Sequence, residues 1–355
     1  MAQIGIAGAG LAGRLFAWAL LRAGHSVEVF DPAPGPTPLF NGQGAAAFTA
    51  AGLLSPLAEQ EAGGAEVAAL GWQSLALWPQ IVAHLAAQAG GTVRLRTPGS
   101  LLLAHAQDLG AAQRMLARMK AAEPLTAAQL ADMEPTLLPG LRAWLLPGEG
   151  LIHPVEAMAA LHDDANLRAA RVTASVQLCW HWGQQVSEVM PYQLRIQGER
   201  RHYDWAIDAR GLGAAVQRPG LRGVRGEIIT LALPQHGLRR PLRLLHPRHR
   251  VYLLPRDDDQ LVLGASEIES EDRSPMSVQS AVELMAAAHS VMPALAEARI
   301  TRLDVNLRPA LPDNLPRAEC EPGLLRLLGL YRHGWLLAPA LVQQLLQKSE
   351  LGSLA

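Results

Sequence analysis

Gly8-Ala-Gly-Leu-Ala-Gly13, close to the start of the chain, is the stretch that decides the fold. It follows an apolar segment at residues 3–7 and opens an apolar-periodic segment at residues 11–23, which predicts a strand, a tight turn and a helix. In such a turn the first glycine allows the sharp bend, the second lets a pyrophosphate approach the backbone, and the third lets helix and strand pack closely. The N-terminus of the helix also attracts the phosphate charge.

A second strand is expected at residues 26–30, and Asp31 follows directly after it. A carboxylate at this distance from the glycines accepts hydrogen bonds from a ribose. A chain with 32 glycines can match the spacing by chance, so a purely structural glycine turn is the alternative. The strand, the helix and Asp31 together favour a βαβ unit that binds a dinucleotide.

The composition bounds the size and the class of the protein. The chain has 355 residues, enough for about two domains, and its net charge of −1 argues against binding to nucleic acid or to an anionic membrane surface. Residues 4–21 are apolar, but Arg14 and the glycines interrupt them, so no integral membrane segment or secretion signal is expected. Cys179 and Cys320 lie far apart and form neither a disulfide framework nor a zinc motif, which predicts a cytoplasmic protein without a metal.

Patterns typical of βα units lie at both ends of the chain, while the middle alternates short β-like segments with polar turns. A long helix with a kink or break at Pro79 is expected at residues 65–88, and a strand at residues 172–178. The predicted fold class is α/β, α+β overall: a Rossmann-like domain with an inserted, mainly antiparallel β-sheet domain. The predicted boundaries give the first domain residues 1–85, 150–215 and 310–355, and the second, substrate-binding domain residues 86–149 and 216–309.

Two motifs near the C-terminus carry a family resemblance. Leu307-Arg-Pro309 with Pro312-Asp313, and Gly329-Leu-Tyr-Arg-His-Gly-Trp-Leu-Leu-Ala-Pro339, are similar to the RP…PD and GHxRNGxxxAP motifs of the FAD-dependent D-amino-acid oxidase superfamily. The resemblance is nearest to the glycine oxidase and sarcosine oxidase-like branch, with Leu330 and His333 standing where the motif has His and Asn. Further segments along nearly the whole chain resemble this branch, among them those at residues 48–56, 99–104, 133–135, 150–154, 204–211, 225–227, 252–256 and 264–267.

The resemblance implies that the first domain binds FAD. Relatives that attach the flavin covalently use a cysteine just before the RP motif, where this chain has Val305, Asn306 and Leu307, so noncovalent FAD is expected. The residues implied around the cofactor are Gly8, Gly10, Leu11, Ala12, Gly13, Asp31, Thr49, Ala50, Ala51, Gly52, Leu53, Val172, Arg210, Gly211, Arg332, His333, Gly334, Trp335 and Leu336.

The activity that the resemblance implies is hydride transfer from the α-carbon of a small amino acid or amine to flavin N5. The substrate would be glycine, an N-substituted glycine or a D-amino acid, and the imine would hydrolyse to a 2-oxo acid. Arg308 is the first candidate to bind the substrate carboxylate and Arg332 the second, because a guanidinium forms two parallel hydrogen bonds to a carboxylate. Tyr252 is the candidate hydroxyl donor to the same carboxylate. The structural alternatives are an exposed strand charge for Arg308, a surface residue at a helix start for Arg332 and a half-buried strand tyrosine for Tyr252.

Two other functions remain open from the sequence. An FAD monooxygenase shares the glycine motif, but it usually carries a Gly-Asp pair at its second flavin contact, where this chain has Tyr331-Arg-His-Gly334. The second open function is that of a flavoprotein with a maturation or partner-binding role. The electron acceptor, oxygen or another carrier, and assembly into a homo-oligomer are also left open.

Three further groups of residues are expected to be structural. His246-x-x-His249 has no carboxylate partner nearby, so a metal is not expected there. Trp180-His181-Trp182 is expected to pack rather than to stack on a cofactor, and Asp257-Asp-Asp259 is expected to form a hairpin turn.

Overall fold

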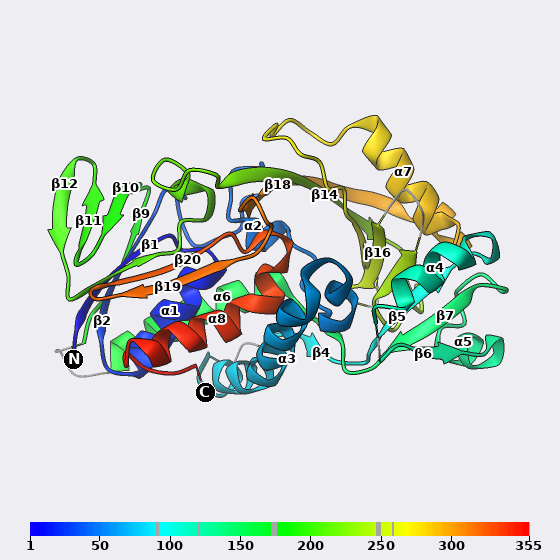
Figure 1. Cartoon of the computed structure of the whole chain (residues 1–355), viewed down its shortest axis with the longest axis horizontal. Helices are drawn as coiled ribbons and strands as arrows, with labels where there is room; N and C mark the ends of the chain where they lie inside the picture. The colour runs from blue at the N-terminus through cyan, green and yellow to red at the C-terminus, as the bar shows by residue number, and fades with distance from the viewer. Residues whose placement is uncertain (90–91, 120, 172–175, 246–249, 258, 355) are drawn as a thin grey trace.

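The computed structural model describes residues 1–89, 92–119, 121–171, 176–245, 250–257 and 259–354. Val172, His246, His249 and Asp258, which are named above, lie outside these ranges. The described residues form four sheets, of six, eight, three and three strands. The six-stranded and eight-stranded sheets lie at opposite ends of an elongated molecule (Figure 1).

The six-stranded sheet has the order β19-β20-β13-β1-β2-β9, and its pairings are parallel except that of β19 with β20. The central strand β1 pairs with the next strand of the chain on one side and with β13, from the middle of the chain, on the other. This is the Rossmann-like sheet that the glycine motif predicts. Its strands are β1 (Gln3–Ala7), β2 (Ser26–Asp31), β9 (Leu178–Trp182), β13 (Trp205–Asp208), β19 (Arg317–Glu321) and β20 (Leu324–Leu328).

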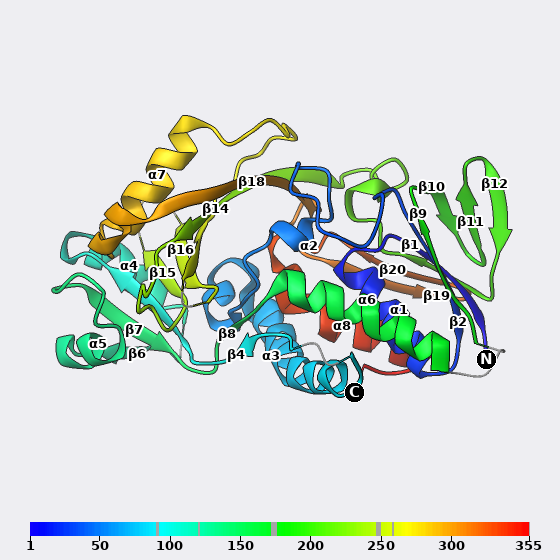
Figure 2. The same ribbon diagram turned by 180° about the vertical axis from the view of Figure 1, so that it is seen from behind.

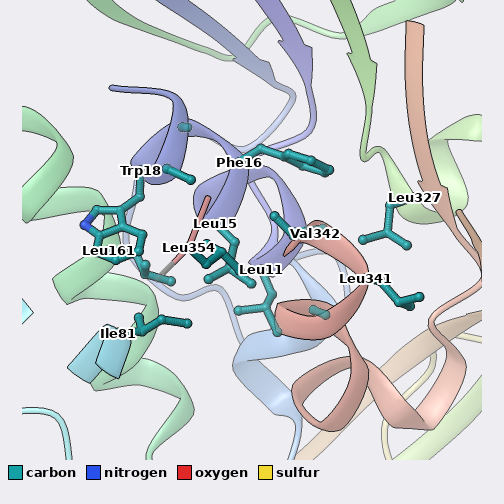
Figure 3. Close-up of a cluster of buried hydrophobic side chains, with 14 of the residues drawn as sticks. Leu11, Leu15, Phe16, Trp18, Ile81, Leu161, Leu327, Leu341, Val342 and Leu354 are labelled. Atoms are coloured by element: carbon teal, nitrogen blue, oxygen red, sulfur yellow. The ribbon is translucent and has the colours of Figure 1, made fainter. Parts of the chain in front are cut away.

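Four helices gather on one side of this sheet: α1 (Leu11–Arg22), α3 (Pro56–Ala89), α6 (Pro154–Arg171) and α8 (Gly334–Lys348) (Figures 1 and 2). Their apolar faces form the main core because each helix buries its stripe against the others and the sheet. Figure 3 shows Leu15 and Trp18 of α1 in this core with Ile81 of α3, Leu161 of α6 and Val342 of α8.

The break in α3 lies at Gly64, whose φ of 71° is not helical, and the helix continues through Pro79. The predicted break at Pro79 is therefore wrong. Glycine adopts a positive φ without the steric cost that other residues meet, so the interruption falls on it. The helix also begins at Pro56, well before the predicted residue 65.

On the opposite face of the six-stranded sheet lies an antiparallel sheet of β10 (Val186–Met190), β11 (Gln193–Ile196) and β12 (Glu199–His202). Val186 and Leu194 pack there against Ala206 and Phe30. The Rossmann-like sheet is thus covered on both faces, as a parallel sheet requires. Of the strand predicted at residues 172–178, residues 172–175 lie outside the described part, and strand β9 begins at Leu178.

The eight-stranded sheet has the order β18-β14-β17-β16-β15-β5-β7-β6 and is antiparallel except for the pairing of β5 with β15. The fold class predicted from the sequence, a Rossmann-like sheet joined to a mainly antiparallel one, is confirmed; the exact domain boundaries stay a prediction. The strands are β5 (Ser100–Ala104), β6 (Glu123–Leu125), β7 (Arg142–Leu146), β14 (Arg222–Ala232), β15 (Leu242–Leu245), β16 (Arg250–Pro255), β17 (Gln260–Gly264) and β18 (Arg299–Ala310).

The remaining elements are short. Thr126 caps α5 through a capping box with Gln129, as expected of a threonine at this position, and Asp257 and Asp259 lie in the β16–β17 hairpin turn. No described helix is long and apolar enough to cross a membrane. These elements are α2 (Ala46–Thr49), α4 (Leu109–Leu116), α5 (Ala127–Met133), α7 (Val278–His289), β3 (Leu53–Leu54), β4 (Leu95–Arg96), β8 (Gly150–Ile152), η1 (Ala106–Asp108), η2 (Gly211–Ala214), η3 (Pro293–Glu297) and η4 (Tyr331–His333).

Candidate functional site

A cavity of about 1720 Å³ is lined by residues from both large sheets and from the helices between them. Gly13 does not line it, because this glycine packs against the Gly8 carbonyl, and Val172 lies outside the described residues. The predicted site residues that line it are Gly8, Gly10, Leu11, Ala12, Asp31, Thr49, Ala50, Ala51, Gly52, Leu53, Arg210, Gly211, Tyr252, Arg308, Arg332, His333, Gly334, Trp335 and Leu336.

The turn between β1 and α1 forms one end of the cavity. Gly8 has a φ of 100°, and a Cβ on Gly13 would collide with the Gly8 carbonyl oxygen, so both positions require glycine. Gly10 caps α1 without a side-chain hydrogen bond, which leaves the first N–H groups of the helix available to an anion. Asp31 accepts hydrogen bonds from the N–H groups of Ala9 at 2.6 Å and Ala33 at 2.8 Å, so its carboxylate fastens the turn beside the cavity.

Arg14, at the same end, is a site residue that the sequence reasoning passed over. Only 1% of it is exposed, and its guanidinium donates to three backbone carbonyls, those of Ala9, Pro36 and Met158. Burial lowers its pKa to about 10, so it remains charged at neutral pH. Its immediate hydrogen-bond partners are neutral, which leaves a buried positive charge at the cavity wall that suits the pyrophosphate of a dinucleotide. A signal was present in the sequence: an arginine directly after the third glycine of an apolar helix.

The turn from η4 into α8 forms another part of the cavity wall. The Trp335 indole N–H donates to Ala47 at 3.1 Å, and the Trp78 indole N–H donates to the Trp335 carbonyl at 3.0 Å, so the first turn of α8 is held from two sides. The N-cap residue His333 makes no capping side-chain bond, and the N-terminal N–H groups of α8 are therefore free to face a negatively charged group.

Glu59, from the start of α3, is the centre of a buried ion cluster that the sequence did not predict. Its carboxylate lies 2.8 Å from Arg332, 2.9 Å from Arg243 and 3.4 Å from His333 Nδ1. Burial acts to raise the pKa of Glu59, but Arg332 and Arg243 hold it well below its usual range. Burial also lowers the pKa of His333 to about 4, against the opposing effect of Glu59, so the imidazole is neutral at pH 7.

Arg332 is engaged by two carboxylates, because its guanidinium also lies 3.0 Å from Glu267. Arg308 differs in its partners. It is half-buried on β18, it donates to the carbonyls of Arg225 at 3.3 Å and Ser266 at 3.0 Å, and it has no carboxylate partner among the described residues. Of the two arginines, Arg308 is the one whose charge is available to a bound carboxylate.

Two glycines make room for the polar ends of Arg308 and Tyr252. A Cβ on Gly226 would lie less than 3.0 Å from the Arg308 guanidinium, and a Cβ on Gly264 would lie 2.6 Å from the Tyr252 hydroxyl. Burial raises the pKa of Tyr252, so its hydroxyl stays protonated and able to donate at neutral pH. The strands β14, β16, β17 and β18 thus present one guanidinium and one hydroxyl to the same cavity.

Arg210 and the Trp180-His181-Trp182 segment have structural contacts. Arg210 lines the cavity but pairs with Asp208 at 2.7 Å, so its guanidinium is already neutralised. Trp182 stacks on Trp180 at a ring separation of 5.6 Å and also lines the cavity wall, while His181 stacks on Phe30. No group of three metal-ligating side chains occurs among the described residues.

Residues 3–346 match the sequence profile of the DAO family, described as FAD dependent oxidoreductase. A protein of Rhizobium etli that carries the name of a thiamine biosynthesis oxidoreductase, ThiO, is 36% identical over 348 residues, which cover 98% of this chain and 96% of that protein.

Among solved structures, glycine oxidase from Geobacillus kaustophilus superposes with a TM-score of 0.81 at 24% identity, covering 96% of this chain and 93% of that one. Iminodiacetate oxidase from Chelativorans sp. BNC1 superposes with a TM-score of 0.78 at 22% identity, covering 96% of this chain and 94% of that one. At these identities the two structures show a shared fold.

Proposed function

The chain belongs to the DAO family of FAD-dependent oxidoreductases, and we propose that it oxidises the carbon–nitrogen bond of a small amino acid. The substrate is glycine, an N-substituted glycine or a D-amino acid, and the imine product hydrolyses to a 2-oxo acid. When bound, FAD supplies the hydride acceptor for this oxidation. The electrons then pass to oxygen or to another carrier.

The observation that carries the proposal is the Arg308 guanidinium, which lines the cavity without a carboxylate partner among the described residues. A guanidinium forms two parallel charge-assisted hydrogen bonds with a carboxylate, and this fork fixes the orientation as well as the position of an amino acid. The protonated hydroxyl of Tyr252 adds a third donor in the same cavity. Substrate carboxylate binding by Arg308 and Tyr252 therefore orients the α-carbon.

The other charged residues of this wall hold the site rather than exchange protons. Glu59 remains ionised between Arg243 and Arg332, and His333 remains neutral at pH 7. The amine must therefore enter the oxidation unprotonated, and the contribution of the chain is positioning.

The cradle at the N-terminus fits FAD. The glycine turn, the buried charge of Arg14 and the Asp31 carboxylate would hold the pyrophosphate and ribose, and the N-terminus of α8 would face the flavin ring, where negative charge develops on reduction. We propose noncovalent binding, because the segment of Val305, Asn306 and Leu307 has no cysteine.

Anaerobic bleaching of the flavin by a panel of amino acids and amines, without NAD(P)H, tests the proposal. Glycine, sarcosine or a D-amino acid should bleach the flavin, and Arg308→Ala should slow bleaching by an amino acid far more than bleaching by its decarboxylated analogue. Bleaching that requires NAD(P)H would replace the proposal with a monooxygenase. A flavin that no substrate bleaches, with or without NAD(P)H, would favour a partner-binding role.

A further inference from the structure

Helix α4 and the turn that follows it bring two arginines to the cavity that the proposed reaction does not use. Arg114 and Arg118 both line the cavity, together with Met115 and Met119 of the same segment. Both arginines are exposed; Arg114 lies in the last turn of α4 and Arg118 in the turn that follows the helix. Within the described part of the chain, neither guanidinium has an ion-pair or hydrogen-bond partner.

The packing of α4 places these arginines at the substrate end of the cavity. Ala112 and Met119 belong to the same apolar cluster as Ala58 and Leu245. Ala58 directly precedes Glu59 on α3, and Leu245 lies on β15, two residues beyond Arg243. Both views of the fold show the first turns of α3 between α8 and the region of α4 and β5 (Figures 1 and 2).

The register of the sheet completes this placement. Arg243 of β15 lies directly opposite Tyr252 of β16, and Tyr252 is the hydroxyl assigned to the substrate carboxylate. One end of the cavity therefore contains Tyr252, Arg243, Arg114 and Arg118, whereas Asp31 and the glycine turn lie with the Rossmann-like sheet.

If the substrate has a single carboxylate, the substrate end of the cavity keeps an excess of positive charge. Glu59 and Glu267 are neutralised by Arg243 and Arg332. Glu283 also lines the cavity and has an interaction of its own. Once Arg308 binds one carboxylate, Arg114 and Arg118 still present two positive charges, and a focused positive potential in a cleft attracts a second anion.

We infer that the substrate is an N-substituted glycine whose nitrogen substituent ends in a second carboxylate. This inference rests on the proposed function and names the substrate class of the same site. The glycine carboxylate binds Arg308 and Tyr252, and the distal carboxylate binds Arg114 and Arg118. The flexible side chains of Met115 and Met119 form the adaptable wall beside the substituent.

The reaction balances for such a substrate. The α-carbon loses a hydride to the cofactor and the nitrogen loses its proton, which forms a C=N bond. Water then adds to that carbon and the carbon–nitrogen bond breaks, so that N-(2-carboxyethyl)glycine gives β-alanine and glyoxylate. The two electrons leave the cofactor to oxygen or another carrier.

The test compares N-(2-carboxyethyl)glycine with its distal amide, N-(2-carbamoylethyl)glycine, which has nearly the same shape and lacks the second charge. The wild-type holoenzyme should prefer the diacid by about 10-fold in kcat/KM, and more at low than at high ionic strength, because the arginines are exposed. Arg114→Gln and Arg118→Gln should each reduce this preference by about 3-fold or more. The matched control, Arg142→Gln, removes an exposed arginine of β7 that does not line the cavity, and it should leave the preference unchanged.

A binding measurement that needs no turnover separates this inference from the proposed function. Calorimetry on the holoenzyme should show that 3-(carboxymethylthio)propanoate, which has sulfur in place of nitrogen, binds more tightly than (propylthio)acetate. Arg114→Gln/Arg118→Gln should abolish the difference. Equal binding of the two probes by the wild type, or a difference that survives in the double variant, would overturn the second carboxylate site. If none of the diacid, its distal amide, glycine, sarcosine and the D-amino acids bleaches the flavin, the proposed function itself is wrong.

Discussion

Gly226→Ala moves the proposed substrate anchor without removing its charge. A Cβ at this position would lie within 3.0 Å of three atoms of the Arg308 guanidinium, whereas ordinary van der Waals contact begins at 3.4 Å. The obstacle is the far end of a flexible side chain, so the backbone can stay in place while the guanidinium retreats by about 1 Å. We therefore expect a small effect on stability and a large one on the binding of the substrate carboxylate.

The size of the effect follows from the geometry of the fork. A retreat of about 1 Å breaks at least one of its two charge-assisted hydrogen bonds, a loss of about 1.5–3 kcal/mol. At 1.4 kcal/mol for each factor of ten, kcat/KM for the best amino acid should fall about 10- to 140-fold. A misplacement of this size within a positioned site is known to cost on the order of 100-fold.

A double-mutant cycle provides the assay. Stopped-flow measurement of anaerobic flavin reduction gives kcat/KM for the wild type, Gly226→Ala, Arg308→Ala and the double variant, with flavin content and melting temperature as folding controls. Gly226→Ala should have little further effect once Arg308 is absent, because the group that it displaces is gone. An equal loss in both backgrounds would refute the reasoning, since Gly226 would then act on the sheet or the cofactor rather than through Arg308.

The remaining predictions concern the cofactor and the buried charges. The flavin should be released into the supernatant on acid precipitation, and a yellow pellet would contradict noncovalent binding. Asp31→Ala should weaken FAD binding by about 1.5–3 kcal/mol, measured by fluorescence titration of the apoprotein. The variant lacks the carboxylate that accepts from the Ala9 N–H group and that would accept from the ribose hydroxyls. The folded state lowers the pKa of His333 from 6.5 to about 4, so the unfolded chain binds more protons between these values and stability should rise with pH across this window. In denaturant titrations, His333→Asn should remove about 2 kcal/mol of the difference in unfolding free energy between pH 5 and pH 6.5. If the variant keeps the whole difference, the pH dependence comes from other groups. His153 is one such group, because burial also lowers its pKa to about 4.

The sequence alone determined the local elements and much of the candidate site. Gly8 has a φ of 100° and Gly13 leaves no room for a Cβ beside the Gly8 carbonyl, so both positions require glycine for reasons that lie within one turn of chain. The same holds for the capping box at Thr126. The C-terminal motifs pointed to Arg308 through a family resemblance, and the structure places that residue on the cavity wall.

Tertiary structure decided which charges are free. Arg308 and Arg332 are both arginines of C-terminal motifs, yet Arg332 is neutralised by Glu59 and Glu267, which come from distant parts of the chain. Arg14 likewise finds its carbonyl partners at Pro36 and Met158 only after folding. An ion pair or a buried hydrogen bond depends on distance and on the exclusion of water, and packing between remote segments sets both. The residue types near a site can therefore be predicted from their motifs, whereas their charge state and availability are properties of the folded chain.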